Sequence, residues 1–200
     1  MLRTFLIYLS KAAWAQKTIT SWGFARRAAS RFVAGETVSD AIRVVRELNA
    51  KGINSTLDQL GEHTSTAEEA NASADAIVKV LQEIDKAGVK ANVSIKLTQI
   101  GMGLDEETCR QNLVKILEQA KKSANFIRVD MEDTPYTDIT LAMVQSMLER
   151  GFTPNQVGLV QQAYLFRAES DLRGLLNSGA RVRLKTARWT RKPPSERPAE

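Results

Sequence analysis

The sequence contains almost no cysteine or histidine. Its 200 residues include one cysteine, Cys109, and one histidine, His63. A single cysteine excludes a disulfide framework within the chain and any zinc site built from several cysteines. A single histidine argues against a histidine-rich metal centre and against a Ser-His-Asp triad. No stretch of 18 apolar residues occurs, so nothing in the sequence predicts a membrane-spanning helix.

Acidic residues are missing from the first 35 positions, and the surplus of positive charge gathers at the other end. The first acid is Glu36, after six lysines and arginines. The formal net charge is +5, and the last twenty residues hold seven basic and two acidic residues. A nucleic-acid-binding protein usually spreads its basic residues over a folded face. The charge distribution therefore predicts no nucleic-acid partner.

The acid-free leader permits three interpretations. An Arg-rich, acid-poor leader is typical of a mitochondrial presequence, which would place the protein in the mitochondrial matrix. Its interleaved aromatic and basic residues also suit a helix lying on an anionic membrane. The third interpretation, which we favour, is a pair of helices packed on the domain. Residues 1–50 are accordingly predicted to form N-terminal helices.

From residue 51 onward, strand-like and helical segments alternate. Helical spacing of apolar residues separates the expected strands, and the pair Ser65 and Glu68 forms a capping-box pattern before the second helix. Such alternation predicts parallel strands with right-handed crossovers, in a doubly wound sheet or a (β/α)8 barrel. The expected strands are residues 53–60, 93–97, 126–132, 157–164 and 181–184.

The faces of the strands favour the barrel. In the strand expected at 126–132, Ile127 and Val129 share one face, while Arg128 and Asp130 share the other. Central strands of a doubly wound sheet are apolar on both faces, whereas a barrel directs polar residues inward near its mouth. The sequence therefore predicts an α/β fold of the (β/α)8 TIM-barrel type. The inward charges alone would also suit an interior ion network without a substrate.

Two reactive residue types are predicted to have no chemical role. Cys109 follows Asp105, Glu106 and Glu107, whose negative charge opposes formation of a thiolate. His63 follows the first strand and has no second imidazole with which to hold a metal, so a surface loop position is expected.

Five short strings in and around the strands resemble the proline dehydrogenase family, especially its single-domain bacterial members. A leader string, residues 32–37 (FVAGET), resembles the family as well. The order and spacing of the strings make the likeness specific, although an aldolase-type or other flavin barrel would share the strand faces. The five strings are residues 57–62 (LDQLGE), 94–99 (SIKLTQ), 128–133 (RVDMED), 162–165 (QAYL) and 182–184 (VRL).

The resemblance implies a distorted (β/α)8 barrel that holds FAD in its mouth. Members of the family oxidise L-proline to Δ1-pyrroline-5-carboxylate in proline catabolism and usually pass the electrons to a membrane quinone. The resemblance thus implies a cytoplasmic protein, peripheral on the inner membrane in some members. A homo-oligomer is compatible with the sequence.

The resemblance also implies roles for three charged residues. Lys96 matches the family's substrate-binding lysine, which holds the carboxylate of proline. Asp130 matches a catalytic acid that orients the substrate amine and holds Lys96. Arg183 matches a catalytic arginine near the reactive nitrogen of the flavin, where positive charge stabilises the reduced ring.

Three further positions match residues that bind the cofactor or close the mouth. Gln162 matches an amide that reads the donors and acceptors on the pyrimidine edge of the flavin. Met131 is expected to contact the flavin mainly through its backbone. Glu62 matches a gate carboxylate that pairs with an arginine when the mouth closes.

The likeness ends at Leu184, after five strands of eight. Residues 51–184 therefore predict an incomplete barrel, and residues 185–200 a basic, disordered tail produced by a truncated gene or a shifted reading frame. Five strands leave two open edges, and the family's late arginine pair has no counterpart here. Weak flavin binding and impaired turnover are expected. The alternative is a non-catalytic fragment that self-associates or binds anionic surfaces through its tail.

Overall fold

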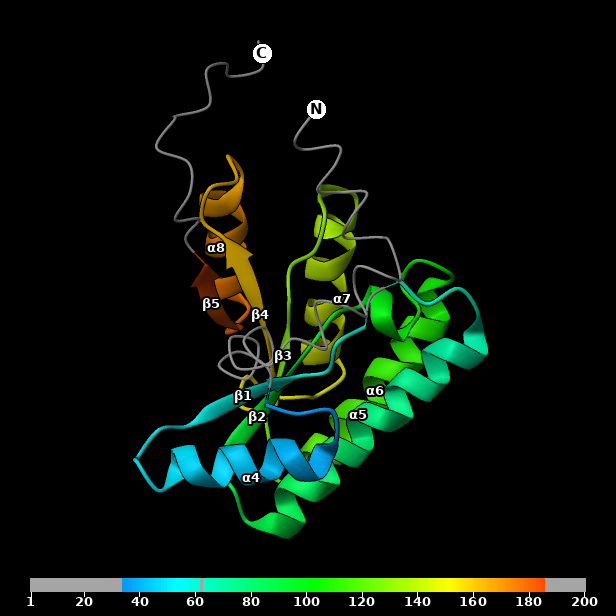
Figure 1. Cartoon of the computed structure of the whole chain (residues 1–200). Coiled ribbons are helices and arrows are strands. Elements are labelled where there is room, and N and C mark those ends of the chain that lie inside the picture. The colour runs from blue at the N-terminus through cyan, green and yellow to red at the C-terminus, as the bar shows by residue number, and fades with distance from the viewer. Residues whose placement is uncertain (1–33, 62, 186–200) are drawn as a thin grey trace, which may run out of the picture.

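A computed structural model of the chain describes residues 34–61 and 63–185, in which one parallel sheet is flanked by helices (Figure 1). The strands lie side by side in chain order, and every neighbouring pair is parallel. The predicted alternation of strands and helices is therefore confirmed. The strands are β1 (Ser55–Asp58), β2 (Ala91–Ile95), β3 (Ile127–Val129), β4 (Val157–Gln162) and β5 (Arg181–Lys185).

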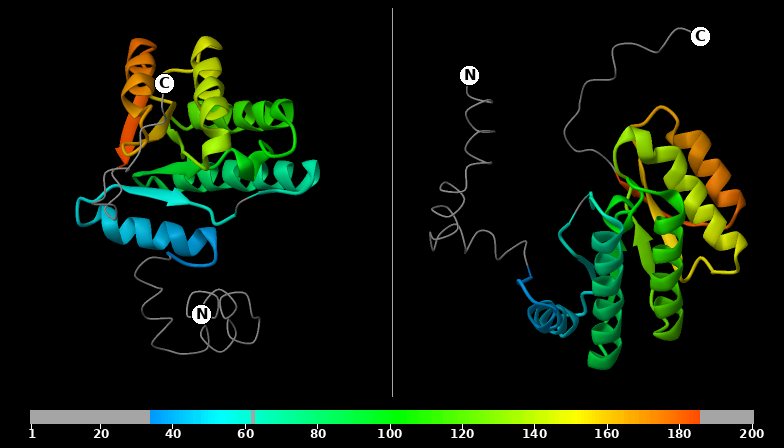
Figure 2. Two further views of the ribbon diagram at one scale, coloured as in Figure 1. Left: turned by 90° about the horizontal axis from the view of Figure 1, so that it is seen from above. Right: turned by 90° about the vertical axis from the view of Figure 1, so that its right-hand side faces the viewer.

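Helices form an arc around the strands, which is clearest from above (Figure 2). They are α4 (Val38–Asn49), α5 (Ala67–Ala87), α6 (Glu106–Lys122), α7 (Thr137–Glu149) and α8 (Ala168–Asn177), with short 3₁₀ turns η1 (Thr98–Ile100) and η2 (Thr134–Tyr136). Within the described ranges, no helix is both long and apolar enough to cross a membrane. The predictions for residues 1–33, for Glu62 and for residues 186–200 lie outside the described residues.

The start of α5 differs from the prediction by one residue. Thr66, and not Ser65, is the N-cap, and its hydroxyl accepts a hydrogen bond from the Glu69 backbone N–H at 3.2 Å. The Glu69 carboxylate in turn accepts from the Ser65 backbone N–H at 2.7 Å. Both Ser65 and Thr66 have a glutamate three residues later, so the sequence pattern fits either register. The bond to Thr66 satisfies one donor of the first helical turn, and the bond to Glu69 ties the preceding residue to the same turn.

The core lies between the outer face of the sheet and the helices. Strand residues such as Val93, Ile95 and Val129 are buried there against α5 and α6. Burying each such side chain contributes about 1.5–3 kcal/mol. The helices supply the opposite side of this core, with Ile77, Leu81, Leu113, Ile116, Leu117, Met143 and Met147.

The inner face of the sheet carries mostly polar or charged residues, as the strand pattern predicts. The parallel register places Asp58, Ser94, Arg128, Gly158 and Arg181 side by side across the five strands. Three strands are shorter than expected: β1 spans four residues, β3 three and β4 six. The residues that follow them leave the sheet and form the loops at its carboxyl edge.

Candidate active site

Four of the residues singled out by sequence lie on the inner face, three of them at the carboxyl ends of the strands. Lys96 directly follows β2, Asp130 directly follows β3, Gln162 is the last residue of β4, and Arg183 lies within β5. Alternation along each strand directs them to the same side as Ser94 and its neighbours. This edge of a barrel is where active sites form, and we call it the mouth.

Lys96 forms an ion pair within the mouth. Its ammonium Nζ lies 3.6 Å from Oδ2 of Asp58 on the neighbouring strand β1. The lysine side chain is 19% exposed and that of Asp58 is 40% exposed, so water screens the pair, and it stabilises the fold by at most about 1 kcal/mol. The pair nonetheless keeps a cation at the mouth. Sequence reasoning did not assign Asp58, although its place in the 57–62 string and on the inward face of β1 was a usable signal.

Asp130 is held by β2. Its Oδ1 accepts a hydrogen bond from the Ser94 hydroxyl at 2.7 Å, and its backbone N–H donates to the Ile95 carbonyl at 2.8 Å. Ser94 is buried and Asp130 half-buried. The carboxylate is therefore fixed toward the interior by a residue that the sequence analysis left without a role. The expected contact between Asp130 and Lys96 stays a prediction.

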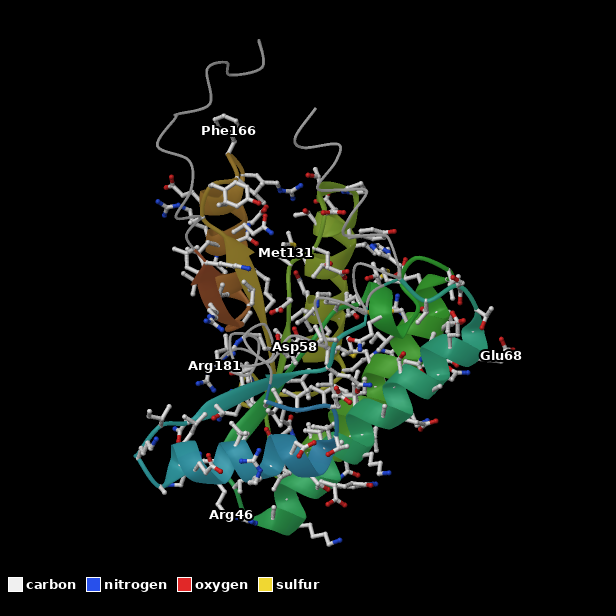
Figure 3. The ribbon with its side chains drawn as sticks, viewed as in Figure 1. Arg46, Asp58, Glu68, Met131, Phe166 and Arg181 are labelled. Carbon is white, nitrogen blue, oxygen red and sulfur yellow. The ribbon has the colours of Figure 1, made fainter. Side chains whose placement is uncertain are left out.

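Gln162, Arg183 and Met131 present different groups to the mouth. Gln162 is half-buried and Arg183 exposed, so the side chains of both are accessible from the inner side. Met131 is 8% exposed, and its side chain belongs to the apolar core. The flavin contact expected of its backbone stays a prediction. Figure 3 labels Met131 and Asp58 among the surrounding side chains.

The loop after β1 is tied to the strand ends on both sides of Glu62, which itself lies outside the described residues. The backbone N–H and hydroxyl of Thr64 donate to the Thr98 carbonyl, at 3.4 and 3.2 Å. Thr98 in turn donates from its backbone N–H to the Glu132 carboxylate at 3.1 Å, and also from its hydroxyl. On the other side, the Gln99 side-chain amide donates to the Gln59 carbonyl at 3.3 Å. These bonds connect the described residues on either side of position 62 to the loop after β2.

Cys109 is unreactive, as predicted, but the main cause is burial and not the nearby acids of its helix. The pKa of its thiol is raised to about 12, mainly by burial and next by the nearby Glu132 carboxylate. The prediction relied on the acids of that turn, Asp105 and Glu106, whose effect on the pKa is smaller. The thiol therefore stays protonated and is unsuited to nucleophilic chemistry.

The parallel sheet, the outer helices and the polar mouth define a chain of the (β/α)-barrel class, of which the described residues form five strands. The sequence model of the proline dehydrogenase family matches residues 41–187, well over half of the chain. The chain belongs to the proline dehydrogenase family.

Relatives with known names agree with this assignment. Proline dehydrogenase 1 of Bacillus subtilis (strain 168) is 35% identical over 187 residues, which cover 92% of this chain and 60% of the relative. Proline dehydrogenase of Deinococcus radiodurans is 36% identical over 159 residues, covering 78% of this chain and 51% of the relative. The chain thus spans about 60% of the length of the first of these relatives.

A solved structure confirms the fold class. The crystal structure of proline utilization A (PutA) from Bdellovibrio bacteriovorus, a protein inactivated there by N-propargylglycine, superposes on this chain with a TM-score of 0.73. The match covers 87% of this chain and 21% of that protein, at 19% sequence identity. At this identity the likeness supports the barrel-type fold only.

Proposed function

We propose that this chain carries the substrate- and flavin-binding part of a proline dehydrogenase, which oxidises L-proline to Δ1-pyrroline-5-carboxylate with FAD. The observation that supports the proposal most is the convergence of Lys96, Asp130, Gln162 and Arg183 on one face and at one edge of the sheet. Membership of the proline dehydrogenase family supports the assignment of all four residues to one site for substrate and flavin.

The two charges of an amino acid find complementary groups in the mouth. The Lys96 ammonium, kept in place by Asp58, suits the carboxylate of proline. Oxidation to the imine removes a hydride from the ring carbon that adjoins the nitrogen and does not bear the carboxylate, and a proton from the nitrogen. The Asp130 carboxylate, held by Ser94, is suited to accept a hydrogen bond from that nitrogen and to orient it.

The residues nearest to the end of β4 and β5 suit a flavin. FAD, when bound, supplies the group that accepts the hydride. The half-buried amide of Gln162 offers both a donor and an acceptor, as the pyrimidine edge of a flavin requires. The accessible guanidinium of Arg183 suits the negative charge that reduction adds. Because the side chain of Met131 is buried in the core, its backbone is the part available to contact the flavin ring.

The last part of the proposal concerns the electron acceptor and the location of the protein. Transfer to a membrane quinone, by a protein that is cytoplasmic or peripheral on the inner membrane, is supported by the family resemblance alone. The alternative location is the mitochondrial matrix, and a homo-oligomeric assembly is compatible with either location. The described sheet is open at both edges, so we also propose that the isolated 200-residue chain binds FAD weakly and has impaired turnover.

A chimera tests the proposal. Residues 34–185 would replace the matching segment of the Bacillus subtilis relative, so that the remaining length of that protein completes the barrel. The purified chimera should be yellow, contain FAD in a one-to-one ratio and reduce a dye only when L-proline is added. Parallel measurements on the 200-residue chain and on the unmodified relative provide the two reference points. A folded chimera without flavin, or with flavin that proline does not reduce, would contradict the proposal.

A further inference from the structure

Glu132 is a half-buried carboxylate that follows β3 and bonds to the segment that follows β2. One of its oxygens accepts a hydrogen bond from the Thr98 backbone N–H at 3.1 Å, and the other accepts from the Thr98 hydroxyl. Within residues 34–61 and 63–185, no lysine or arginine forms an ion pair with it. The two bonds to Thr98 therefore connect the segments that leave neighbouring strands.

These bonds continue the alignment of β2 and β3 beyond the ends of both strands. The register pairs Ile95 with Val129, and the offset of 34 positions between them also separates Thr98 from Glu132. Between these two pairs, the Asp130 backbone N–H donates to the Ile95 carbonyl at 2.8 Å. The two segments thus leave the sheet side by side, and the Glu132 side chain supplies the link farthest from the sheet.

The segment that Glu132 holds is the buried 3₁₀ turn η1. Its three residues are at most 3% exposed. A neutral side chain also bonds to this turn, since the Asn112 amide donates to the Ile100 carbonyl at 3.1 Å. Hydrogen bonds to an ionised group are stronger than those between neutral groups, so Glu132 provides a stronger hold on the turn than Asn112 does.

The turn in turn fixes the backbone of Lys96. This residue lies between β2 and η1, and its carbonyl accepts a hydrogen bond from the Gln99 backbone N–H at 3.2 Å. The ammonium is at the end of a flexible side chain, so its position depends on where that backbone is held. A displaced turn would move the cation relative to Asp130, and small displacements of binding groups are costly.

The geometry favours an indirect role for Glu132. Both of its carboxylate oxygens bond to Thr98, which is fully buried. By contrast, Asp130 accepts its hydrogen bond from Ser94 on the inner face, where the substrate is expected. Glu132 is therefore placed to act on the protein and not on the substrate.

We propose that Glu132 is a positioning residue, which acts through Thr98 to hold the turn after β2 and thereby places the Lys96 ammonium for the carboxylate of proline. The inference rests on the proposed function, because that function assigns the substrate carboxylate to Lys96. Disruption of the Glu132–Thr98 pair should weaken the binding of proline and leave the chemical step almost unchanged. A pair with only a structural role would have no selective effect on substrate binding.

Asp105 and Thr108 provide a matched control at the start of α6. The Asp105 carboxylate accepts hydrogen bonds from the backbone N–H and the hydroxyl of Thr108, at 2.7 and 2.9 Å. The same two kinds of bond therefore occur in the layer of outer helices. Thr98→Val and Thr108→Val remove the equivalent hydroxyl from each pair, and circular dichroism would confirm that each variant is folded.

The first test measures proline oxidation in the chimera. Thr98→Val and Glu132→Gln should each raise the KM for L-proline at least five-fold and change kcat less than two-fold. Thr98→Ser, which keeps the hydroxyl, should stay within two-fold of the original KM, and Thr108→Val should not change it. The double variant Thr98→Val/Glu132→Gln should be no worse than the more impaired single variant, because the two residues act as one unit.

Three results of this test would overturn the proposal. They are an unchanged KM in Thr98→Val, an equal rise of KM in Thr108→Val, and a fall in kcat as large as the rise in KM. The last result would place Glu132 in the chemical step itself.

Hydrogen exchange on the complete 200-residue chain separates this inference from the proposed function. The amides of residues 98–100 should exchange at least ten-fold faster in Glu132→Gln than in the original chain, and Asp105→Asn should not affect them. Unchanged exchange in Glu132→Gln would overturn the proposal whether or not the chimera oxidises proline. Faster exchange, together with an unmodified chimera that does not oxidise proline, would contradict the proposed function and support the hold of Glu132 on the turn.

Discussion

The two faces of the same sheet differ in what they do for the protein. On the outer face, residues such as Val93 and Ile95 are almost completely buried against helices. On the inner face, the alternate residues Ser94 and Lys96 make hydrogen bonds and an ion pair with neighbouring strands. The comparison indicates that the outer face supplies most of the stability, whereas the inner face contributes less and holds polar groups available for function. Function is therefore expected on the inner face.

The largest loss of stability is expected on the outer face. Ile95→Ala removes a fully buried side chain at the centre of the core and should lower the free energy of unfolding by about 2–5 kcal/mol. Urea denaturation followed by circular dichroism measures the change. A loss below about 1 kcal/mol would mean that this site collapses around the smaller side chain and that the outer core is looser than described.

A smaller loss is expected on the inner face. Ser94→Ala removes the hydroxyl that donates to Asp130, which should cost roughly 1–2 kcal/mol because the half-buried carboxylate loses a charge-assisted bond. The same denaturation experiment applies. A loss as large as that of Ile95→Ala would remove the distinction between the two faces.

The stabilising effect of Asp105, at the start of α6, should depend on pH. Asp105 is the N-cap of this helix, and hydrogen bonds from the backbone N–H and hydroxyl of Thr108 lower the pKa of its carboxyl below the usual value of 3.8. Its stabilising effect is therefore fully present above pH 3.8 and disappears as the pH falls through the lower, folded-state pKa.

Asp105→Ala should accordingly lower the melting temperature at neutral pH, and by less at strongly acidic pH. Thermal unfolding of the variant and the original chain at a series of pH values measures this difference. A difference that is constant down to strongly acidic pH would show that the carboxylate charge has no part in the cap.

The smallest effect is expected where both charges are exposed. Arg173 pairs with Glu169 one helical turn earlier on α8, and both side chains are more than three-quarters exposed. Arg173→Gln should change the free energy of unfolding by about 0.5 kcal/mol or less. A loss above that of Ser94→Ala would show that α8 depends on its surface charges more than on its few buried residues.

Much of the architecture follows from the sequence, because the alternation of apolar residues reports which face of a strand is buried. The order of strands and helices, and the inward direction of Lys96 and Asp130, could be predicted from this alternation. Contacts between residues on neighbouring strands could not be predicted, because the alternation does not report how the strands are aligned. The pairing of Asp58 with Lys96 and of Ser94 with Asp130 therefore becomes visible only when the strands are aligned.

The ends of the strands and the roles of the mouth residues were harder to predict, each for its own reason. The apolar pattern continues through Met131, but the chain leaves the sheet after Val129 because the next residues form the mouth. The contact between the Arg181 guanidinium and the Phe126 ring was not predicted because the two residues have no local signal in common, and the lack of a side chain at Gly158 leaves room for it. The roles of the mouth residues came from the family resemblance, since residue types alone also fit an interior ion network.

Ile95 and Lys96 are adjacent in sequence and lie on opposite faces, so substituting each separately shows whether stability and substrate binding belong to different faces. In the chimera, the free energy of unfolding and the bleaching of flavin absorbance by L-proline would be measured for Ile95→Ala and Lys96→Met. We expect Ile95→Ala to unfold more readily but to bleach normally per bound flavin, and Lys96→Met to keep its stability but to need far more proline. Bleaching of Lys96→Met at the original proline concentration, or parallel changes in both quantities for both variants, would show that the two faces do not have separate roles.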